Sequence, residues 1–356
     1  MKASLIIIAA ILFNMLSCGR SINKFDMIES KGLETENLGL NALMFYNKDV
    51  GFIAGSSDIV THNPDFPEKD SNQFAFVAKT ALLYKTTDAG RIWGKKDFGE
   101  GSFTDIIQAG SKIFAIKSSK ESKHSFTYSS DDLGANWKEE KSFPQKIGRL
   151  FSIDSGYLAV TSDSSLIKTY IQVSRNFGRS WSISESNLLI FDAVMRGRKL
   201  FYLSSNQYKD YRKNLLVEYS LGDSTKKVIK LPNEFDCYFL TNYNNEIKLS
   251  GLKDGHLAVY SLDKDNQVKY EYSYLKENTY FPQGYYNNKE EEWIIAGKRG
   301  DADVSNKILK TRDNGKSWEV VSFEKEKYIK PFYFLNANDK VKAWFYAGSG
   351  KFQIME

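Results

Sequence analysis

Short apolar runs separated by polar turn residues dominate the chain and predict β-strands. Runs at residues 81–84, 215–221 and 257–263 combine Leu, Val, Ala and Tyr, and Gly, Asp or Asn follows each within a few positions. Three further runs, at residues 331–335, 341–347 and 351–354, end the sequence. The pattern predicts an all-β chain of short strands joined by tight turns.

Four of the turns share one motif, Ser/Thr-x-Asp/Asn-x-Gly-x-x-Trp. They lie at residues 86–93, 130–137, 174–181 and 311–318. Asp88, Asp132 and Asn176 are 44 residues apart, and Asp313 follows 137 residues later, close to three more periods. A period of this length indicates a repeated supersecondary unit of about four strands. The chain is therefore expected to be a row of similar four-stranded sheets.

The residue types of the motif suit a hairpin turn. The hydroxyl and the carboxylate can accept hydrogen bonds from turn N–H groups, and the glycine supplies a positive φ. The tryptophan is a large apolar plate that can fill the space between neighbouring sheets. We therefore assign the motif a structural role. The residues with this role are Thr86, Asp88, Gly90, Trp93, Ser130, Asp132, Gly134, Trp137, Ser174, Asn176, Gly178, Trp181, Thr311, Asp313, Gly315 and Trp318.

This motif resembles the Asp-box of the bacterial neuraminidase repeat. That repeat occurs in sialidases, sortilin-type receptors and photosystem II assembly-factor propellers, and the chain is most similar in pattern to the last type. The resemblance implies a β-propeller of four-stranded antiparallel blades. It also implies that the boxes lie away from the functional face.

In phase with the boxes, the chain divides into six units. Their approximate ranges are 40–98, 102–144, 147–188, 190–233, 236–277 and 279–325. The three C-terminal runs lack a fourth strand, which residues 22–28 could supply. That pairing would close a seventh blade and remove the exposed edges of an open ring. We expect seven blades, with six or eight as the alternatives.

The N-terminus is typical of a lipoprotein signal peptide. Lys2 precedes an apolar run at residues 5–13, and the small Ser17 precedes Cys18. Residues 1–17 are expected to be removed, which leaves residues 18–356 as one propeller domain held by a lipid on Cys18. The alternative is ordinary secretion with an unmodified Cys18. We expect a bacterial cell-envelope protein anchored to a membrane, on the periplasmic side or at the cell surface.

Charge and composition exclude several classes of function. The net charge is only +5, with 49 basic and 44 acidic residues mixed along the chain, so nucleic-acid binding is not expected. Three histidines provide no recognisable catalytic or metal-binding arrangement. We expect no metal, no cofactor and a monomeric protein. Cys237 lies in an apolar run and is expected to be a buried small residue without a disulfide.

Binding is expected on the face opposite the boxes, where loops of unequal length occur at residues 57–73, 117–124, 204–214 and 298–306. Tyr and Arg are apt contact residues. The candidates for partner binding are Tyr208, Tyr211, Arg212 and Arg299. The partner is expected to be a protein, a peptide or a glycan.

The alternative function is that of a sialidase-like glycoside hydrolase. The resemblance to sialidases implies three arginines on a substrate carboxylate, a Tyr with a Glu partner and an acidic Asp. Only Arg20 precedes the first box, and it lacks the sequence context of the family's first arginine. Other glycosidase or lyase chemistry stays open, but a non-enzymatic binding protein is the favoured interpretation.

Overall fold

The computed structural model describes most of the chain. The described residues are 27–33, 38–62, 74–119, 124–143, 146–154, 156–162, 169–176, 180–186, 189–205, 214–243, 245–274, 280–287, 292–298, 306–323, 329–337, 340–347 and 351–355. In these ranges, no helix is long and apolar enough to cross a membrane.

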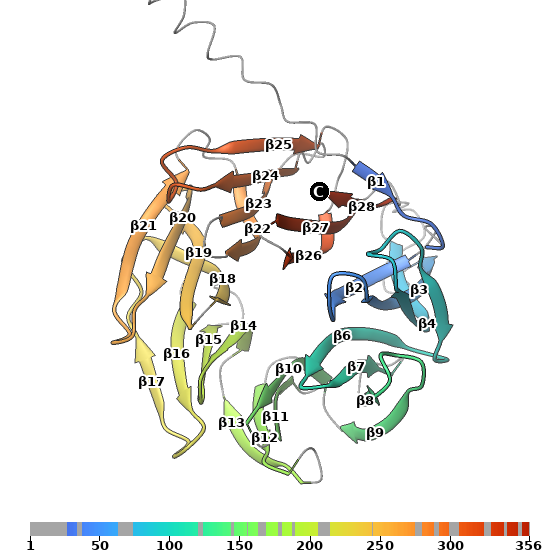
Figure 1. The fold of residues 1–356 in the computed structure, drawn as a ribbon. Helices are drawn as coiled ribbons and strands as arrows, with labels where there is room; N and C mark the ends of the chain where they lie inside the picture. Colours follow the sequence, from blue (N-terminus) through green and yellow to red (C-terminus); the bar gives the residue numbers. More distant parts are fainter. Residues whose placement is uncertain are drawn as a thin grey trace, which may run out of the picture.

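The described residues form seven four-stranded antiparallel sheets arranged in a ring, as the repeat predicts (Figure 1). Blade 1 contains β2 (Leu38–Phe45), β3 (Gly51–His62), β4 (Phe74–Thr86) and β5 (Gly94–Asp97). Blade 2 contains β6 (Ser102–Ala109), β7 (Lys112–Ser118), β8 (Ser125–Ser130) and β9 (Lys138–Phe143). Blade 3 contains β10 (Lys146–Ile153), β11 (Gly156–Ser162), β12 (Thr169–Ser174) and β13 (Ser182–Ser186).

The next three blades repeat this order. Blade 4 contains β14 (Leu189–Arg196), β15 (Lys199–Ser205), β16 (Asn214–Ser220) and β17 (Lys226–Ile229). Blade 5 contains β18 (Phe235–Tyr243), β19 (Glu246–Lys253), β20 (His256–Leu262) and β21 (Val268–Tyr274). Blade 6 contains β22 (Tyr280–Asn287), β23 (Glu292–Lys298), β24 (Asn306–Thr311) and β25 (Glu319–Phe323).

The last blade joins the two ends of the chain. It contains β26 (Ile329–Ala337), β27 (Lys340–Ala347), β28 (Lys351–Met355) and the N-terminal β1 (Met27–Glu29). β1 pairs with β28, so that Met27 lies opposite Met355, and Figure 1 shows β1 beside β28. Just beyond β1, the Lys31 carbonyl accepts a hydrogen bond from the Trp93 N–H of blade 1 at 3.0 Å. The same short segment therefore completes the last blade and ties it to the first.

Apolar side chains between the blades form the core. One cluster joins blades 4 and 5 through Phe201, Leu249 and Tyr260, and another joins blades 3 and 4 through Leu158 and Tyr202. The box tryptophans contribute to several of these junctions. Their ring contacts with the preceding blade are Trp137 with Phe52, Trp181 with Phe143, and Trp318 with Tyr272 and Tyr274. Cys237 is fully buried in the cluster between blades 4 and 5, as predicted.

The first box shows how the motif closes its turn between the third and fourth strands. Thr86 Oγ1 accepts a hydrogen bond from the Gly90 N–H at 3.0 Å and donates one to Asp88 at 2.7 Å. Asp88 accepts the Ile92 N–H at 2.9 Å. The Trp93 indole N–H donates to the Gly90 carbonyl at 2.8 Å, a bond that the motif alone does not predict. The hydroxyl and carboxylate therefore satisfy turn N–H groups that lack ladder partners.

The other boxes repeat this geometry where the structure describes them. In blade 3, Asn176 accepts the Ser180 N–H through its amide oxygen at 2.8 Å, so an amide can replace the carboxylate. Hydrogen bonds to exposed turn carboxylates lower the pKa of Asp132 to about 2, chiefly through the Asn136 N–H. A Cβ at Gly315, where φ is +77°, would lie 2.4 Å from the Tyr272 ring, so glycine is also needed for packing there.

Each innermost strand carries a β-bulge that the sequence pattern did not reveal. One extra residue interrupts the pairing of the first strand with the second at an equivalent position in every blade. In blades 2, 3 and 4 the residues directly after the bulge are Asp105, Arg149 and Asp192. The bulges therefore set three charged residues at matching positions on neighbouring inner strands.

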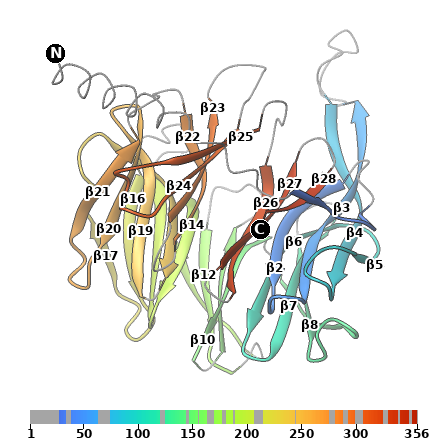
Figure 2. The ribbon, with the colours of Figure 1, turned by 45° about the horizontal axis from the view of Figure 1, so that its top comes forward.

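The prediction of a loop at residues 57–73 is partly wrong. β3 continues to His62 and pairs with β4 from Phe74, beyond a bulge at Ser57 and Asp58. Figure 2 shows this hairpin, in light blue, projecting beyond the neighbouring blades. Residues 74–78 form an apolar run, and their backbone extends the ladder, because strand pairing satisfies backbone groups that a loop would leave to water. The other predicted loops also lose their terminal residues to flanking strands.

We predict that Thr86→Val destabilises the protein. The side chain is almost fully buried and nearly isosteric with valine, but valine leaves the Gly90 N–H without its acceptor. An unsatisfied buried donor costs about 1–3 kcal/mol. Urea unfolding should show this loss, while Thr87→Val at the neighbouring exposed position should change the free energy of unfolding by less than about 0.5 kcal/mol. Equal effects of the two substitutions would contradict the role given to the hydroxyl.

Candidate functional site

The structure leaves several predicted site residues outside its described ranges. These are Cys18, Tyr208, Tyr211, Arg212 and Arg299. Gly178 of the third box also lies outside them. The lipid anchor therefore stays a prediction. So do the partner contacts on the face opposite the boxes, which we call the loop face. The other box residues lie at the end of the third strand of a blade and in the turn that leads to the fourth.

Three arginines that bind other groups of the protein lie in three different places. Arg149 contacts Asp192 on the inner strands, at 3.4 Å. Arg196 donates to the Leu262 and Asp263 carbonyls of blade 5, and Arg175 donates to the Leu221 carbonyl of blade 4. These contacts attach neighbouring blades to one another. In the described part of the chain, these three guanidinium groups thus have separate structural partners and do not form one carboxylate-binding cluster.

A charged cluster lies on the inner strands β6, β10 and β14. Asp192 is almost fully buried and accepts hydrogen bonds from the Ala193 N–H at 3.0 Å and from the Leu240 N–H of blade 5 at 2.8 Å. The Arg149 side chain keeps 53% of its surface exposed while it contacts this carboxylate. Asp192 therefore connects three successive blades and leaves a positively charged group facing solvent.

In Asp105, another carboxylate of the cluster, the cost of burying the charge is only partly offset by neighbouring groups. Burial raises its pKa to about 6, although the charge of Arg149 and the Ile106 N–H act in the opposite direction. Burial also raises the pKa of Asp192, against the charge of Arg149 and two backbone N–H groups. Asp105 can therefore take up a proton as the pH falls through about 6.

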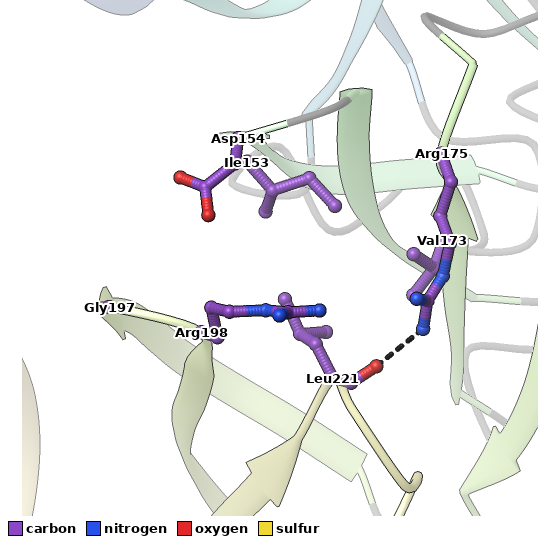
Figure 3. Close-up of a pocket in the computed structure, with 7 residues that line it drawn as sticks. All are labelled: Ile153, Asp154, Val173, Arg175, Gly197, Arg198 and Leu221. Carbon is purple, nitrogen blue, oxygen red and sulfur yellow. Dashed lines mark hydrogen bonds between the residues drawn. The ribbon is translucent and has the colours of Figure 1, made fainter.

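A small pocket with a volume of about 150 Å³ lies between blades 3 and 4. It is on the face of the ring that carries the box turns, which we call the box face. Its polar residues come from turns that join neighbouring strands of one blade. Asp154 lies between β10 and β11, Arg175 between β12 and β13, and Arg198 between β14 and β15. Ile153, Val173 and Leu221 are its apolar residues. Figure 3 shows the Arg198 side chain extending towards Arg175, while the carboxylate of Asp154 points away from Arg175.

The arrangement of this pocket suits a carboxylate that is attached to a short apolar group. Arg175 is anchored by its bond to the Leu221 carbonyl, which leaves the other donors of its guanidinium available. Arg198 adds a second guanidinium, and two guanidinium groups against the one carboxylate of Asp154 leave the pocket with a net positive charge that favours a bound anion. A carboxylate can accept paired hydrogen bonds from such groups. The volume is sufficient for a carboxylate with a short side chain.

The sequence contained part of the signal for these residues. Asp105, Arg149 and Asp192 are separated by 44 and 43 residues, which matches the period of the boxes. Charged residues that recur with the repeat should occupy equivalent positions in successive blades. Arg175 and Arg198 have no such relation, because they come from different turns of neighbouring blades. Only the packing of blade 3 against blade 4 brings them together.

The described residues contain no group of three or more His, Cys, Asp or Glu side chains arranged to hold a metal ion. The carboxylate of Asp263, whose turn also contains Asp265, is occupied by internal contacts. Asp263 accepts the Gln267 N–H at 2.8 Å and pairs with Lys269 at 2.9 Å. Its carboxylate thus acts as a turn acceptor in the same way as those of the boxes.

The ring of four-stranded sheets defines the chain as a β-propeller. No protein-family model and no curated protein matches its sequence. Its fold is similar to that of solved propellers. These include YCF48 bound to a D1 peptide, with a TM-score of 0.63, 12% identity and coverage of 94% of this chain and 95% of that chain. YCF48 from Cyanidioschyzon merolae gives a TM-score of 0.62 and 14% identity, with coverage of 93% and 98%.

A third similar structure is the β-propeller domain of the Trilobed protease from Pyrococcus furiosus. It gives a TM-score of 0.58 and 11% identity, with coverage of 90% of this chain and 94% of that chain. That propeller is described as having an open velcro topology, whereas β1 pairs with β28 here. At these identities, the likeness shows the fold alone.

We predict that Asp105→Asn stabilises the protein more at pH 8 than at pH 4.5. The folded-state pKa of about 6 lies above the unfolded value of about 3.8, so the folded state binds more protons between these values. Stability from Asp105 is therefore lost as pH rises from about 4 to 6. Asparagine removes this loss and can still accept the Ile106 N–H.

Urea unfolding at the two pH values measures the difference, which should be on the order of 2 kcal/mol. Asp154→Asn, at an exposed turn, is the matched control and should show no such difference. An Asp105→Asn variant that is equally destabilised at both pH values would mean that the ionised pair with Arg149 stabilises the fold.

Proposed function

We propose that the protein is a non-enzymatic propeller that binds a protein or peptide segment at the cell envelope. The pocket between blades 3 and 4 carries this proposal. Arg175 and Arg198 provide guanidinium groups for a carboxylate of the partner, and Ile153, Val173 and Leu221 provide an apolar surface for the attached side chain. A peptide C-terminus or an acidic side chain combines these two chemistries.

The fold supports this proposal by analogy. YCF48, which is similar in fold at 12% identity, has been solved with a D1 peptide bound. A propeller is a rigid scaffold that can present several turns to one ligand, and such turns are common sites of binding. The pocket of this chain lies among four turns of two neighbouring blades. Binding here needs no movement of the blades.

A second contact surface is proposed on the opposite face. The loops there contain Tyr208, Tyr211, Arg212 and Arg299, residue types that are common at the centres of interfaces. A large partner could contact one face only. The experiment must therefore separate the two faces rather than remove both together.

We predict that Arg198→Ala weakens partner binding about tenfold or more, because a charge-assisted hydrogen bond to the partner is lost. The full-length protein is used to capture partners from detergent-solubilised envelopes, and the captured partner is then titrated calorimetrically. Lys230→Ala removes an exposed positive charge outside the pocket and is the control. A triple variant, Tyr208→Ala, Tyr211→Ala and Arg212→Ala, tests the loop face.

Loss of binding in Arg198→Ala, with normal binding in the other two proteins, supports the pocket. Loss only in the triple variant moves the contact to the loop face but keeps the binding function. Hydrolysis of a sialoside by the purified wild-type protein would overturn the non-enzymatic assignment.

The proposed location depends on Cys18. We predict that Cys18→Ser prevents lipid attachment and moves the protein from the detergent phase towards the aqueous phase, because the apolar run at residues 5–13 is too short to span a membrane by itself. Incorporation of labelled palmitate, together with detergent phase partitioning, measures both effects. Cys237→Ser is the control because this cysteine is buried in the propeller. Equal labelling of wild type and Cys18→Ser would contradict the lipoprotein assignment.

A further inference from the structure

A larger pocket lies one junction away, between blades 2 and 3, and has a volume of about 540 Å³. This size falls within the range of about 300–1,000 Å³ that is typical of small-molecule sites. The turn between β6 and β7 forms one side of it, so it opens on the box face. It shares blade 3 with the Arg175 pocket but uses the other surface of that sheet.

Aromatic side chains form much of its surface. Phe114 of blade 2 and Tyr157 of blade 3 are buried and meet edge to face, with ring centroids 4.8 Å apart. Trp181, at the end of the third box, is partly exposed and also lines the pocket. These rings provide flat apolar surfaces next to solvent.

Charged side chains of opposite sign lie beside the rings. The Lys141 ammonium lies 5.6 Å from the centroid of the Trp181 ring, and Glu140 accepts a hydrogen bond from Ser129 at 2.7 Å. Lys112 pairs with Asp131 at 3.1 Å. Two lysines and one glutamate line the pocket, and Asp131 and Lys138 pair with two of these groups from outside it, so the pocket carries only a small net charge.

Lys141 has an unusual environment among these groups. Partial burial lowers the pKa of its ammonium group, and its contacts in the described part of the chain are with the Phe143 and Trp181 rings rather than with a carboxylate. Its N–H donors are thus available to a ligand. Glu140, next in sequence, provides an acceptor in the same pocket.

These features favour a ligand that is apolar on one face and rich in hydroxyl groups at its edge. A purely apolar side chain would displace water from Lys141 and Glu140 without replacing its hydrogen bonds, which is costly. Sugar hydroxyls can accept from the lysine and donate to the carboxylate, while the ring C–H groups contact the aromatic surfaces. The volume has room for more than one sugar ring.

We propose that the pocket between blades 2 and 3 binds a neutral saccharide. This site is distinct from the proposed peptide site, because the two pockets have no residue in common. A neutral sugar is also a different ligand from the sialic acid of the alternative function, whose carboxylate would require arginines that do not line this pocket.

The test uses the full-length protein in detergent and four neutral disaccharide probes: cellobiose, maltose, lactose and chitobiose. Saturation-transfer NMR detects binding, and calorimetry measures affinity. Lys141→Met removes the donor but keeps a chain of similar length, and it should weaken binding by about tenfold or more. Trp181→Phe should also weaken binding because it reduces the aromatic surface.

Trp318→Phe is the matched control, since it changes the equivalent tryptophan in blade 6 and should leave sugar binding unchanged. Melting temperatures show whether each variant is folded, and Lys141→Met tests the site even if Trp181→Phe is unstable. Arg198→Ala should bind the sugar normally, which separates this site from the peptide site.

Binding of at least one disaccharide that is weakened by Lys141→Met but not by Trp318→Phe supports the proposal. Failure of all four probes, or equal affinity in wild type and Lys141→Met, overturns it. Binding of N-acetyl-leucine amide without any saccharide would identify the pocket as a site for an apolar peptide side chain, and would also overturn it.

Discussion

The structure depends on apolar packing between neighbouring sheets. An isolated four-stranded sheet of this size exposes two faces, and only contact with a blade on each side buries both. Residues such as Leu158, Tyr202 and Leu249 are completely buried in these junctions. Every sheet therefore needs its neighbours, and the ring needs β1 to complete the last blade. Closure through Met27–Glu29 removes the open edge and supplies the missing strand at once.

The box turns and the inner bulges position the chemistry of the molecule. Hydrogen bonds within the boxes use the carboxylates of Asp88, Asp132 and Asp313 for backbone N–H groups, so these acids serve structure. The bulges place Asp105, Arg149 and Asp192 at matching positions around the ring. The candidate binding pockets lie elsewhere, where turns from adjacent blades meet. The box face therefore also contains candidate binding sites, because two of its blade junctions hold pockets.

Much of the fold could be predicted because the repeat is local in sequence. The Gly and Trp positions of the boxes set the phase of the strands, and the unpaired C-terminal strands indicated that the N-terminus closes the ring. The prediction of a loop at residues 57–73 is partly wrong, because the backbone pairing of β3 with β4 continues past a bulge. The polarity of the residues alone does not reveal this continuation. The site was harder to predict: Arg175 was assigned to a box turn, and Arg198 had no motif around it.

The sequence by itself determined the strand order, the register of the blades and the structural role of the boxes, because short-range hydrogen bonds and hydrophobic alternation specify them. Only the tertiary structure decided which side chains share a pocket. Arg175 and Arg198 come from different blades, as do Lys141 and Trp181. Their proximity follows from how twisted sheets pack around an axis, and no spacing along the chain encodes that distance.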